Sequence, residues 1–380
     1  MDRAAGAGCA RKPLRRPLQA LFVVPYPHDT VPGQRFRYEQ WLRLLPAGAI
    51  DVDVRPLLSP QAFATLYQPG AVSKLAGTAA GLARRVRDVA TAGRYDVAFV
   101  FREAFALGPP LIEMLLERRI PVVYDFDDAI FVGDTSAANR SLAGLKWPQK
   151  VSRIVAGATT TSVGNDWLAE WARRHSDRVE VLPTTIDTDV YQPRPRPQRE
   201  IVRLGWSGSP TTIKHLHTVD GALRRLLADL PVELTVVGDA TYTLPGAGPA
   251  GDRVSAKAWS AATEVDDVSS FDIGIMPLPD DGWSRGKCGL KGLQYLSLGV
   301  ATVMSPVGVN TGIITPGENG FLATGEDEWV ETVACLVEDE VLRRKVGEAG
   351  RQTVVDRFSG REWAPRFLDV LERAASSPKR

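Results

Sequence analysis

The chain has 380 residues, of which 44% are apolar and 24% are charged, an ordinary globular balance that is long enough for two domains. Its formal net charge of +1 argues against a dedicated nucleic-acid binder, whose footprint would be a clear basic excess. Three separated cysteines (Cys9, Cys288, Cys335) indicate neither a disulfide framework nor a structural zinc site, so a reducing cytoplasm fits best. No stretch approaches the roughly 20 apolar residues of a membrane span.

The first 17 residues are expected to be a disordered tail. Residues 11–16 are basic and residues 18–24 are apolar, an order that imitates a signal peptide. The apolar run contains Gln19 and has no small-x-small cleavage site after it, so we interpret it as a first buried strand.

Predicted strands and helices then alternate at the spacing of βαβ units, which indicates a parallel sheet covered on both faces. The predicted strands are 21–24, 52–58, 96–101, 121–124, 159–163 and 179–182. The predicted helices are 35–45, 72–90, 110–118, 147–156 and 166–174. We expect this first Rossmann-like domain to span residues 18–192.

The alternation restarts after PRPRPQ at 193–198, which we expect to lie in a stiff, extended linker over 193–200. Further strands are predicted at 202–206, 233–237, 272–276 and 300–304, and further helices at 217–229, 290–298, 329–337, 340–355 and 361–374. The fold class is therefore α/β, with a second Rossmann-like domain over 201–360 and a terminal segment over 361–380. Ligands of such folds bind at the carboxyl ends of the strands, here in the cleft between two sheets.

Residues 283–310 contain the most informative stretch. A loop with Arg285, Gly286, Lys287 and Gly289 leads directly into the predicted helix 290–298. Small and cationic residues at a helix entrance suit a phosphate, because free backbone N–H groups and the positive end of the helix dipole point there. A solvated basic turn is the alternative for both cations.

Four motifs in this order resemble the group 1 (family 4) glycosyltransferases. They are PGQRFR, YDFDDAIF, GWSGSPTT and GKCGLKGLQYLSLGVATVMSPVGVN, and the resemblance covers the chain from Leu18 to Ala374. It implies a GT-B fold and a retaining hexosyltransferase that needs no metal ion or cofactor and uses a nucleotide diphosphate sugar as donor. It also implies a sugar or lipid-linked acceptor, a place in cell-envelope polysaccharide synthesis, and a last helix that packs back on the first domain.

The chain departs from this family at one point. Two glutamates, associated in the family with the donor sugar and the ribose, fall here on Gly286 and Gln294, and the usual proline of the glycine-proline stop is Ala301. Gln294 can still hydrogen-bond ribose hydroxyls as an uncharged amide. Altered donor binding and loss of activity both stay open.

The resemblance also implies roles for individual residues. Lys287 and Arg285 are the candidates for stabilising the departing diphosphate, with Gly289 at the helix entrance. The other donor-binding candidates are Gly33, Arg35, Ser207, Ser209, Thr211, Trp259, Glu264 and Gln294. For Ser209 and Thr211 a helix-capping role is nearly as good, for Trp259 core packing is equally good, and Arg37 shares the phosphate hypothesis with Arg35.

Asp125, Asp127 and Asp128 follow a predicted buried strand. Their mutual repulsion is expected to raise one pKa, so we favour Asp127 as an acceptor-positioning group or general base. Helix capping and a metal site are the alternatives, but no second acidic or histidine cluster completes a metal site. Arg102 and Glu103 are either cleft residues or a local ion pair.

Competing functions are another GT-B activity, such as a nucleotide-sugar epimerase, and a non-catalytic nucleotide-sugar-binding protein. A dinucleotide-dependent dehydrogenase function is poorly supported, because no GxGxxG motif follows a strand. The predicted helix 72–90 carries a basic face, so peripheral contact with the inner face of a membrane stands beside the simpler explanation of a solvated face. The sequence does not identify the nucleotide, the sugar, the acceptor or the oligomeric state.

Overall fold

The computed structural model describes residues 16–65, 71–132, 147–196 and 199–378, without the side chains of 71–75. Residues 1–15 of the expected tail and residues 197–198 of the expected linker lie outside the described residues. Arg16 Nη2 lies 2.7 Å from Asp96 Oδ1, directly before the first strand.

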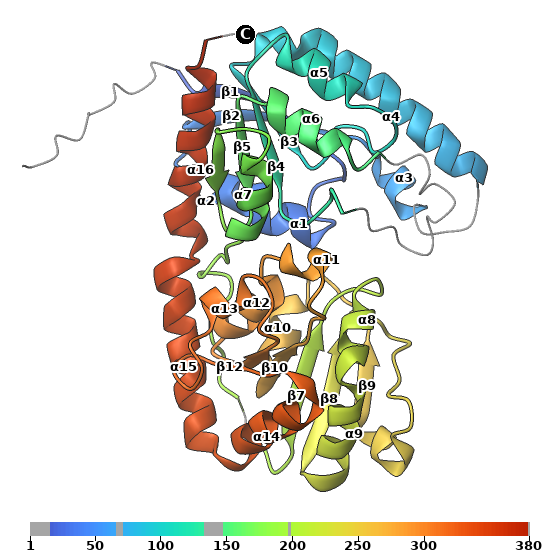
Figure 1. The fold of residues 1–380 in the computed structure, drawn as a ribbon, viewed down its shortest axis with the longest axis vertical. Coiled ribbons are helices and arrows are strands. Elements are labelled where there is room, and N and C mark those ends of the chain that lie inside the picture. The colour runs from blue at the N-terminus through green and yellow to red at the C-terminus, as the bar shows by residue number, and fades with distance from the viewer. Residues whose placement is uncertain (1–15, 66–70, 133–146, 197–198, 379–380) are drawn as a thin grey trace, which may run out of the picture.

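The first sheet, in the upper half of Figure 1, has six parallel strands in the order β2-β1-β3-β4-β5-β6. They are β1 (Leu18–Val24), β2 (Ile50–Pro56), β3 (Val97–Phe101), β4 (Val122–Phe126), β5 (Thr160–Val163) and β6 (Val179–Val181). Its helices are α1 (Pro32–Gln34), α2 (Gln40–Leu44), α3 (Pro60–Ala64), α4 (Ala71–Thr91), α5 (Leu111–Glu117), α6 (Lys150–Gly157) and α7 (Asp166–Arg173). Every residue of β3 and β4 is buried, as expected for apolar strands with helices on both faces.

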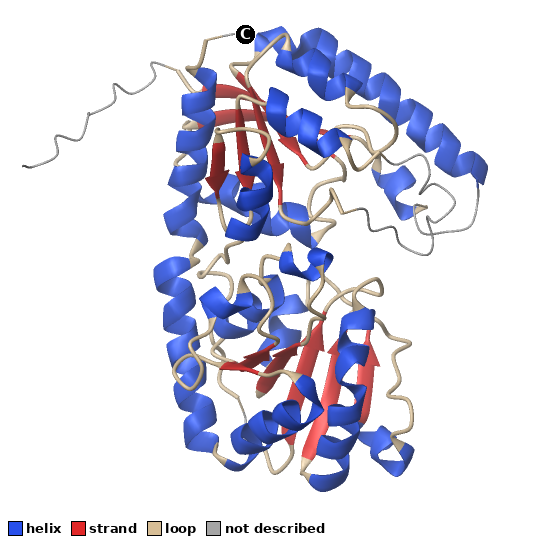
Figure 2. Cartoon of the chain, in the orientation of Figure 1, coloured by secondary structure: helices blue, strands red, loops and turns tan. Residues whose placement is uncertain are grey.

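The second sheet, in the lower half of Figure 2, repeats the architecture with the order β12-β11-β10-β7-β8-β9. Its strands are β7 (Val202–Ser207), β8 (Val232–Val237), β9 (Val254–Lys257), β10 (Ile273–Met276), β11 (Ala301–Met304) and β12 (Phe321–Leu322). The helices around it are α8 (Ile213–Leu216), α9 (Asp220–Asp229), α10 (Glu264–Ser269), α11 (Gly282–Arg285), α12 (Leu290–Ser297), α13 (Asn310–Ile313), α14 (Gly325–Glu338) and α15 (Glu340–Arg357). All strand pairs in both sheets are parallel.

The last helix, α16 (Gly360–Ala375), continues the line of α15 and runs along the first domain, so that the two form one column beside both sheets (Figure 1). Its Phe367 ring lies 5.0 Å from Trp41 and 5.3 Å from Phe99, measured between ring centroids. The chain therefore returns to the core of its first domain after completing the second.

Two predicted helices differ most from the observed ones, and strands β9 and β12 have no predicted counterpart. The predicted helix 35–45 is interrupted by a π-helical turn, Arg35–Glu39, in which Arg37 leaves helical geometry at φ −105° and ψ −107°. The predicted helix 147–156 begins only at Lys150. Strand β9 was not predicted, because its residues VSAK are half exposed at the sheet edge and lack an apolar run.

None of the helices within the described ranges combines the length and the apolar character that crossing a bilayer requires.

Candidate active site between the two sheets

Gly289 sets the start of α12. Its φ of +72° lies in the left-handed region that favours glycine, and an added Cβ would come within 2.5 Å of Ile313 Cδ1. Within the described part of the chain, no side chain caps this helix start. Its first backbone N–H groups and the positive end of its dipole are therefore suited to an anion.

The two cations of the preceding loop point in different directions. Lys287 Nζ lies 2.9 Å from Asp128 Oδ1 in the first domain and 5.0 Å from the centroid of the Trp283 ring. The side chain of Arg285 is 51% exposed and forms two hydrogen bonds to Asp280, at 2.6 and 3.0 Å. Lys287 thus lies between the domains, whereas Arg285 is held at the surface.

Asp127 and Asp128 share one cation from the end of β3. Arg102 Nη2 donates to Asp127 Oδ1 over 2.9 Å and also contacts Asp128, with Arg102 itself at a positive φ of +58°. Burial, opposed by Arg102 and reinforced by Asp128, raises the pKa of Asp127. Burial acts in the same sense on Asp128, but Lys287 and Arg102 outweigh it and lower the pKa of Asp128. The two carboxylates are thereby driven apart in acidity.

Arg37 is not available to a phosphate, which corrects that part of the sequence hypothesis. Its side chain is fully buried, pairs with Asp125, and donates to the carbonyl oxygen of Leu182. Asp125 also accepts from Ser162 Oγ at 2.6 Å. Asp125 and Arg37 therefore brace the first domain beneath the cleft.

Gly33 brings the loop after β1 against the acidic pair. A Cβ at Gly33 would lie 3.2 Å from both Arg102 Nη2 and Asp127 Oδ2, so only glycine allows this approach without a shift of its neighbours.

Glu103, the neighbour of Arg102, lies 3.1 Å from Lys150 Nζ and forms a separate ion pair.

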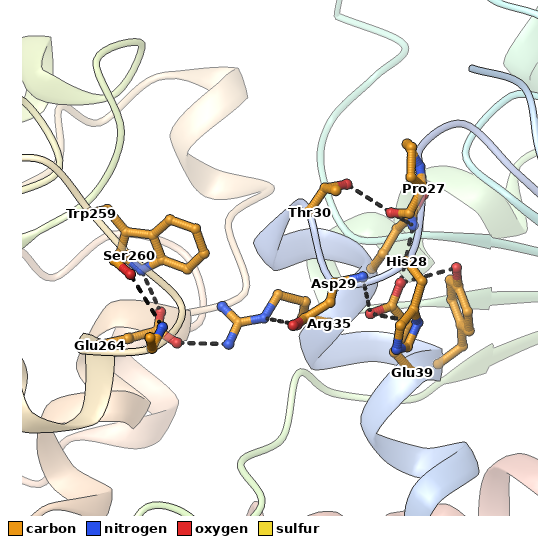
Figure 3. Close-up of polar contacts among 12 residues, drawn as sticks. Pro27, His28, Asp29, Thr30, Arg35, Glu39, Trp259, Ser260 and Glu264 are labelled. Carbon is orange, nitrogen blue, oxygen red and sulfur yellow. Dashed lines mark hydrogen bonds and ion pairs between the residues drawn. The ribbon is translucent and has the colours of Figure 1, made fainter. Parts of the chain in front are cut away.

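Arg35 reaches across to the second domain (Figure 3). Its Nε donates to Asp29 Oδ1 over 2.8 Å, and its Nη2 donates to Glu264 Oε2 over 2.9 Å. The guanidinium also lies over the ring of Trp259, 5.2 Å from its centroid. Burial opposes the charge of Arg35, but Glu264 outweighs it and raises the pKa of Arg35.

Glu264 is the meeting point of this second cluster. It is only 5% exposed and accepts from Trp259 Nε1 at 3.0 Å, Tyr191 Oη at 2.6 Å and Gln294 Nε2 at 3.1 Å, besides Arg35. The structure thus brings together four of the predicted donor-binding residues, from both domains.

The hydroxyl groups after β7 are engaged locally. Ser207 N donates to Tyr295 Oη over 2.8 Å, and Ser207 Oγ lies 3.2 Å from the same oxygen. Ser209 Oγ lies 2.9 Å from Thr211 Oγ1 and 3.2 Å from Thr212 Oγ1. These contacts stabilise the turn before α8, but the N-cap of that helix is Thr212 and no described side chain caps it, so the capping alternative for Ser209 and Thr211 is not met.

A cavity of about 430 Å³ opens beside Trp283, the residue whose ring contacts Lys287. It is lined by Val132, Lys214, His215, Pro279, Asp281, Gly282 and Trp283. His215 is 3% exposed, and neither ring nitrogen has a hydrogen-bond partner among the described residues. Burial, followed by the charges of Lys291, Lys287 and Lys214, lowers the pKa of His215 to about 4. The cavity therefore has a neutral imidazole in a cationic surrounding, which suits an anionic ligand.

Sequence reasoning missed Lys214, His215 and Lys291. Lys291 Nζ lies 4.9 Å from the centroid of the Trp206 ring, and no ion-pair partner for it is found in the described part of the chain. Burial, with Lys287 next, lowers the pKa of Lys291 to about 7. Lys214 and His215 are the second and third residues of α8, after strand β7, and Lys291 is the second residue of α12, after the glycine loop. Only these positions link the three residues to the site.

The two domains interlock around residues 286–288. Asn165 Nδ2 donates to the carbonyl oxygens of Gly286 and Lys287, at 3.1 and 3.0 Å. A Cβ at Gly286 would come within 2.7 Å of Ala129 Cβ and 2.9 Å of its backbone nitrogen. In this arrangement a larger side chain at 286, such as the glutamate of the similar family, has no room.

Among the residues that the structure describes, no group of three or more His, Cys, Asp and Glu is placed to hold a metal ion. The polar groups that converge in the cleft are lysines, an arginine, an imidazole and carboxylates already paired with them.

No model of a known protein family matches the chain. A D-inositol 3-phosphate glycosyltransferase from Stackebrandtia nassauensis is 25% identical over 292 residues, which make up 64% of this chain and 62% of that protein. The chain thus matches a little under two thirds of the length of this relative.

Solved structures share the architecture over almost the whole chain. Sucrose-phosphate synthase from Thermosynechococcus elongatus has a TM-score of 0.70 at 16% identity, covering 94% of this chain and 99% of that one. HepE of Anabaena, in complex with UDP and glucose, has a TM-score of 0.64 at 16% identity, covering 93% and 99%. A glycosyltransferase from Rickettsia africae has a TM-score of 0.67 at 10% identity, covering 96% and 100%. The chain has the GT-B fold.

The GT-B fold confirms the predicted fold class, and the glycosyltransferases among these proteins confirm the resemblance that the four motifs carry. Lys287 and Glu264 both lie in segments that follow strands of the second sheet, and each contacts a residue of the first domain. The roles of the individual site residues stay predictions.

Proposed function

We propose that this protein is a retaining glycosyltransferase that moves a hexose from a nucleotide diphosphate sugar to an acceptor hydroxyl. The observation that carries the proposal is the convergence of Lys214, Lys287 and Lys291 with the uncapped start of α12 beside a cavity in a GT-B cleft. HepE, a structural neighbour, is known in complexes with UDP and with UDP-glucose, and the curated relative is a glycosyltransferase.

The lysines are proposed to hold the diphosphate and to stabilise it as it leaves. Charge develops on the leaving phosphate in the transition state, and preorganised cations stabilise that charge without reorganising. Protein cations and a helix N-terminus take this part in our proposal, in place of a metal ion or another cofactor. Lys287 has the central role because it belongs to the helix entrance and also touches the first domain.

The Glu264 cluster is proposed to bind the nucleoside. Trp259 offers an aromatic face for a base, and Glu264 with Gln294 offers a carboxylate and an amide for ribose hydroxyls. Asp127 is proposed to face the acceptor hydroxyl, because its raised pKa and its position beside Asp128, the partner of Lys287, suit a group that accepts a proton. A sugar or lipid-linked acceptor and a role in envelope polysaccharide synthesis complete the proposal.

We also propose that the protein works at the inner face of a membrane and contacts anionic lipid through α4 and α5. Four large apolar side chains are exposed on these neighbouring helices: Leu82 (42%), Val86 (59%), Leu111 (58%) and Leu115 (43%). Arg87 on α4 and Arg118 and Arg119 in the turn after α5 are exposed, and the charge of Arg87 also acts on Asp53 of β2. Exposed apolar side chains beside exposed arginines complement an anionic bilayer surface.

The test of the donor site uses UDP-glucose as the probe. UDP-glucose is expected to raise the melting temperature of the native protein, and Lys287→Ala is expected to weaken binding about 30-fold, the effect of losing roughly 2 kcal/mol from one charged hydrogen bond. Lys345→Ala, an exposed lysine on α15, is the matched control and is expected to bind normally. Equal binding by Lys287→Ala and the native protein would falsify the assignment, and binding of donor without turnover of its labelled sugar would show a binding protein instead.

A further inference from the structure

Lys287, which we propose binds the leaving diphosphate, already forms an ion pair with a carboxylate. Lys287 Nζ lies 2.9 Å from Asp128 Oδ1, and both side chains are mostly buried, at 22% and 15% exposure. The carboxylate comes from the loop after β4 in the first domain, and the lysine comes from the loop before α12 in the second. Any phosphate oxygen that contacts Lys287 therefore approaches an anion that holds the same position.

Asp128 has a second cation on its other oxygen. Arg102 contacts Asp128 Oδ2 as well as Asp127 Oδ1. If Lys287 turns away from Asp128, the Asp128 carboxylate remains paired with Arg102 and is not left as an isolated buried charge. Release of Lys287 is thus a partner exchange in which each charged group keeps a partner.

From this geometry we infer that Asp128 is an internal competitor that occupies Lys287 until the donor diphosphate displaces it. The inference rests on the proposed donor site. Displacement breaks one of the cross-domain contacts, so donor binding and the relative position of the two domains become linked. The resting enzyme thereby keeps Lys287 neutralised and has a lower affinity for free anions than its lysines alone would give.

If Asp128 only holds Lys287 in place, removing its charge has the opposite effect on donor affinity. If the carboxylate only positions Lys287 for the donor, its removal leaves the lysine less ordered and donor binding becomes weaker. The two explanations therefore predict opposite signs for the change in affinity when Asp128 loses its charge.

The experiment measures the dissociation constant of UDP-glucose by isothermal titration calorimetry for Asp128→Asn. We expect about tenfold tighter binding than for the native protein. Asp280→Asn is the matched control, because it removes a carboxylate from the loop after β10 in the second domain, where Asp280 pairs with the exposed Arg285 and not with Lys287. That control is expected to leave the affinity within about twofold. Asp128→Ser, which keeps a hydroxyl toward Arg102, serves if the asparagine variant does not fold.

A double-mutant cycle separates direct competition from a general field effect. In a Lys287→Ala background, Asp128→Asn is expected to give no gain in affinity, because the competition is for Lys287 itself. Unchanged or weaker binding by Asp128→Asn, or an equal gain from Asp280→Asn, overturns the competitor role while leaving the donor site intact. Failure of the native protein to bind UDP-glucose overturns the proposed function as well, so the two failures are distinguishable.

Discussion

Glu264 explains the amide at position 294. Each oxygen of this buried carboxylate has two donors, with Trp259 and Gln294 on Oε1 and Tyr191 and Arg35 on Oε2. A glutamate at 294, as in the similar family, would place a second carboxylate against the first, and two like charges at such a distance are strongly unfavourable. The glutamine donates instead. A carboxylate therefore remains in this corner of the cleft, supplied by another element.

Lys291 is expected to make donor binding depend on pH near neutrality. Its pKa is lowered to about 7, mainly by burial and then by Lys287. An anionic ligand favours the charged amine and raises its pKa, so binding above about pH 7 takes up a proton. The affinity for UDP-glucose is therefore expected to fall as the pH rises from about 7 to about 9, by at most about tenfold per pH unit.

Calorimetry in buffers of different ionisation enthalpy measures that proton uptake directly. Lys291→Arg keeps the positive charge over the whole range, because a guanidinium stays protonated, and is expected to flatten the pH profile. An arginine variant with the same slope as the native protein would assign the titration to another group.

The site residues differ in how far the sequence reveals them. Lys287 and Gly289 stand out because a basic glycine loop precedes a periodic helix, and both lie at the observed helix entrance. Lys214 and His215 carry no such signal, since α8 has only four residues and no apolar stripe. Their link to Lys287 arises from the packing of loops that follow different strands, which spacing along the chain does not encode.

At the scale of elements, apolar runs in the sequence predicted the buried strands correctly. The elements that differ from prediction are those that tertiary packing changes. The all-apolar β3 and β4 were predictable, because a strand covered on both faces has no polar positions. The break at Arg37 was not, because the helical pattern continues through it. That residue leaves the helix to reach Asp125 inside the first domain, and a tertiary ion pair of this kind overrides local propensity.

The outward faces of α4 and α5 are expected to bind vesicles that contain anionic lipid. Flotation with vesicles of about 30% phosphatidylglycerol in phosphatidylcholine measures it, and vesicles of phosphatidylcholine alone should bind far less, because each surface arginine contributes about 1 kcal/mol only on an anionic bilayer. Serine at both Val86 and Leu111 is expected to reduce flotation at least about tenfold, through the lost apolar area.

Val341→Ser is the control for that experiment. Val341 is 66% exposed on α15, on the other domain, so its replacement removes an exposed apolar side chain similar to Val86 away from the proposed contact. Equal loss of flotation in the control, or none in the double variant, would show that α4 and α5 are an ordinary solvated face.

At the scale of the whole molecule, two separate contacts hold the domains together across the cleft. One joins Asp127, Asp128 and Asn165 to residues 286–288, and the other joins Arg35 to Glu264 and Trp259. The order of motifs along the chain predicted the two-sheet architecture. It did not predict these contacts, because they depend on how the two sheets are set against each other.

Arg35 is expected to couple local stability on both sides of the cleft. It bonds Asp29 in the first domain and Glu264 in the second, so Arg35→Ala removes a link worth about 2 kcal/mol, the contribution of a hydrogen bond to a charged group. Native-state hydrogen exchange is then expected to rise up to roughly 30-fold both in the loop 25–31 and at the start of α10, although the substitution lies in only one domain. Arg361→Ala, which removes an exposed pair with Asp189, is the control and should leave both segments unchanged. Faster exchange confined to the loop 25–31 would mean that Arg35 stabilises its own domain alone and that the cleft is closed by the contacts of residues 286–288.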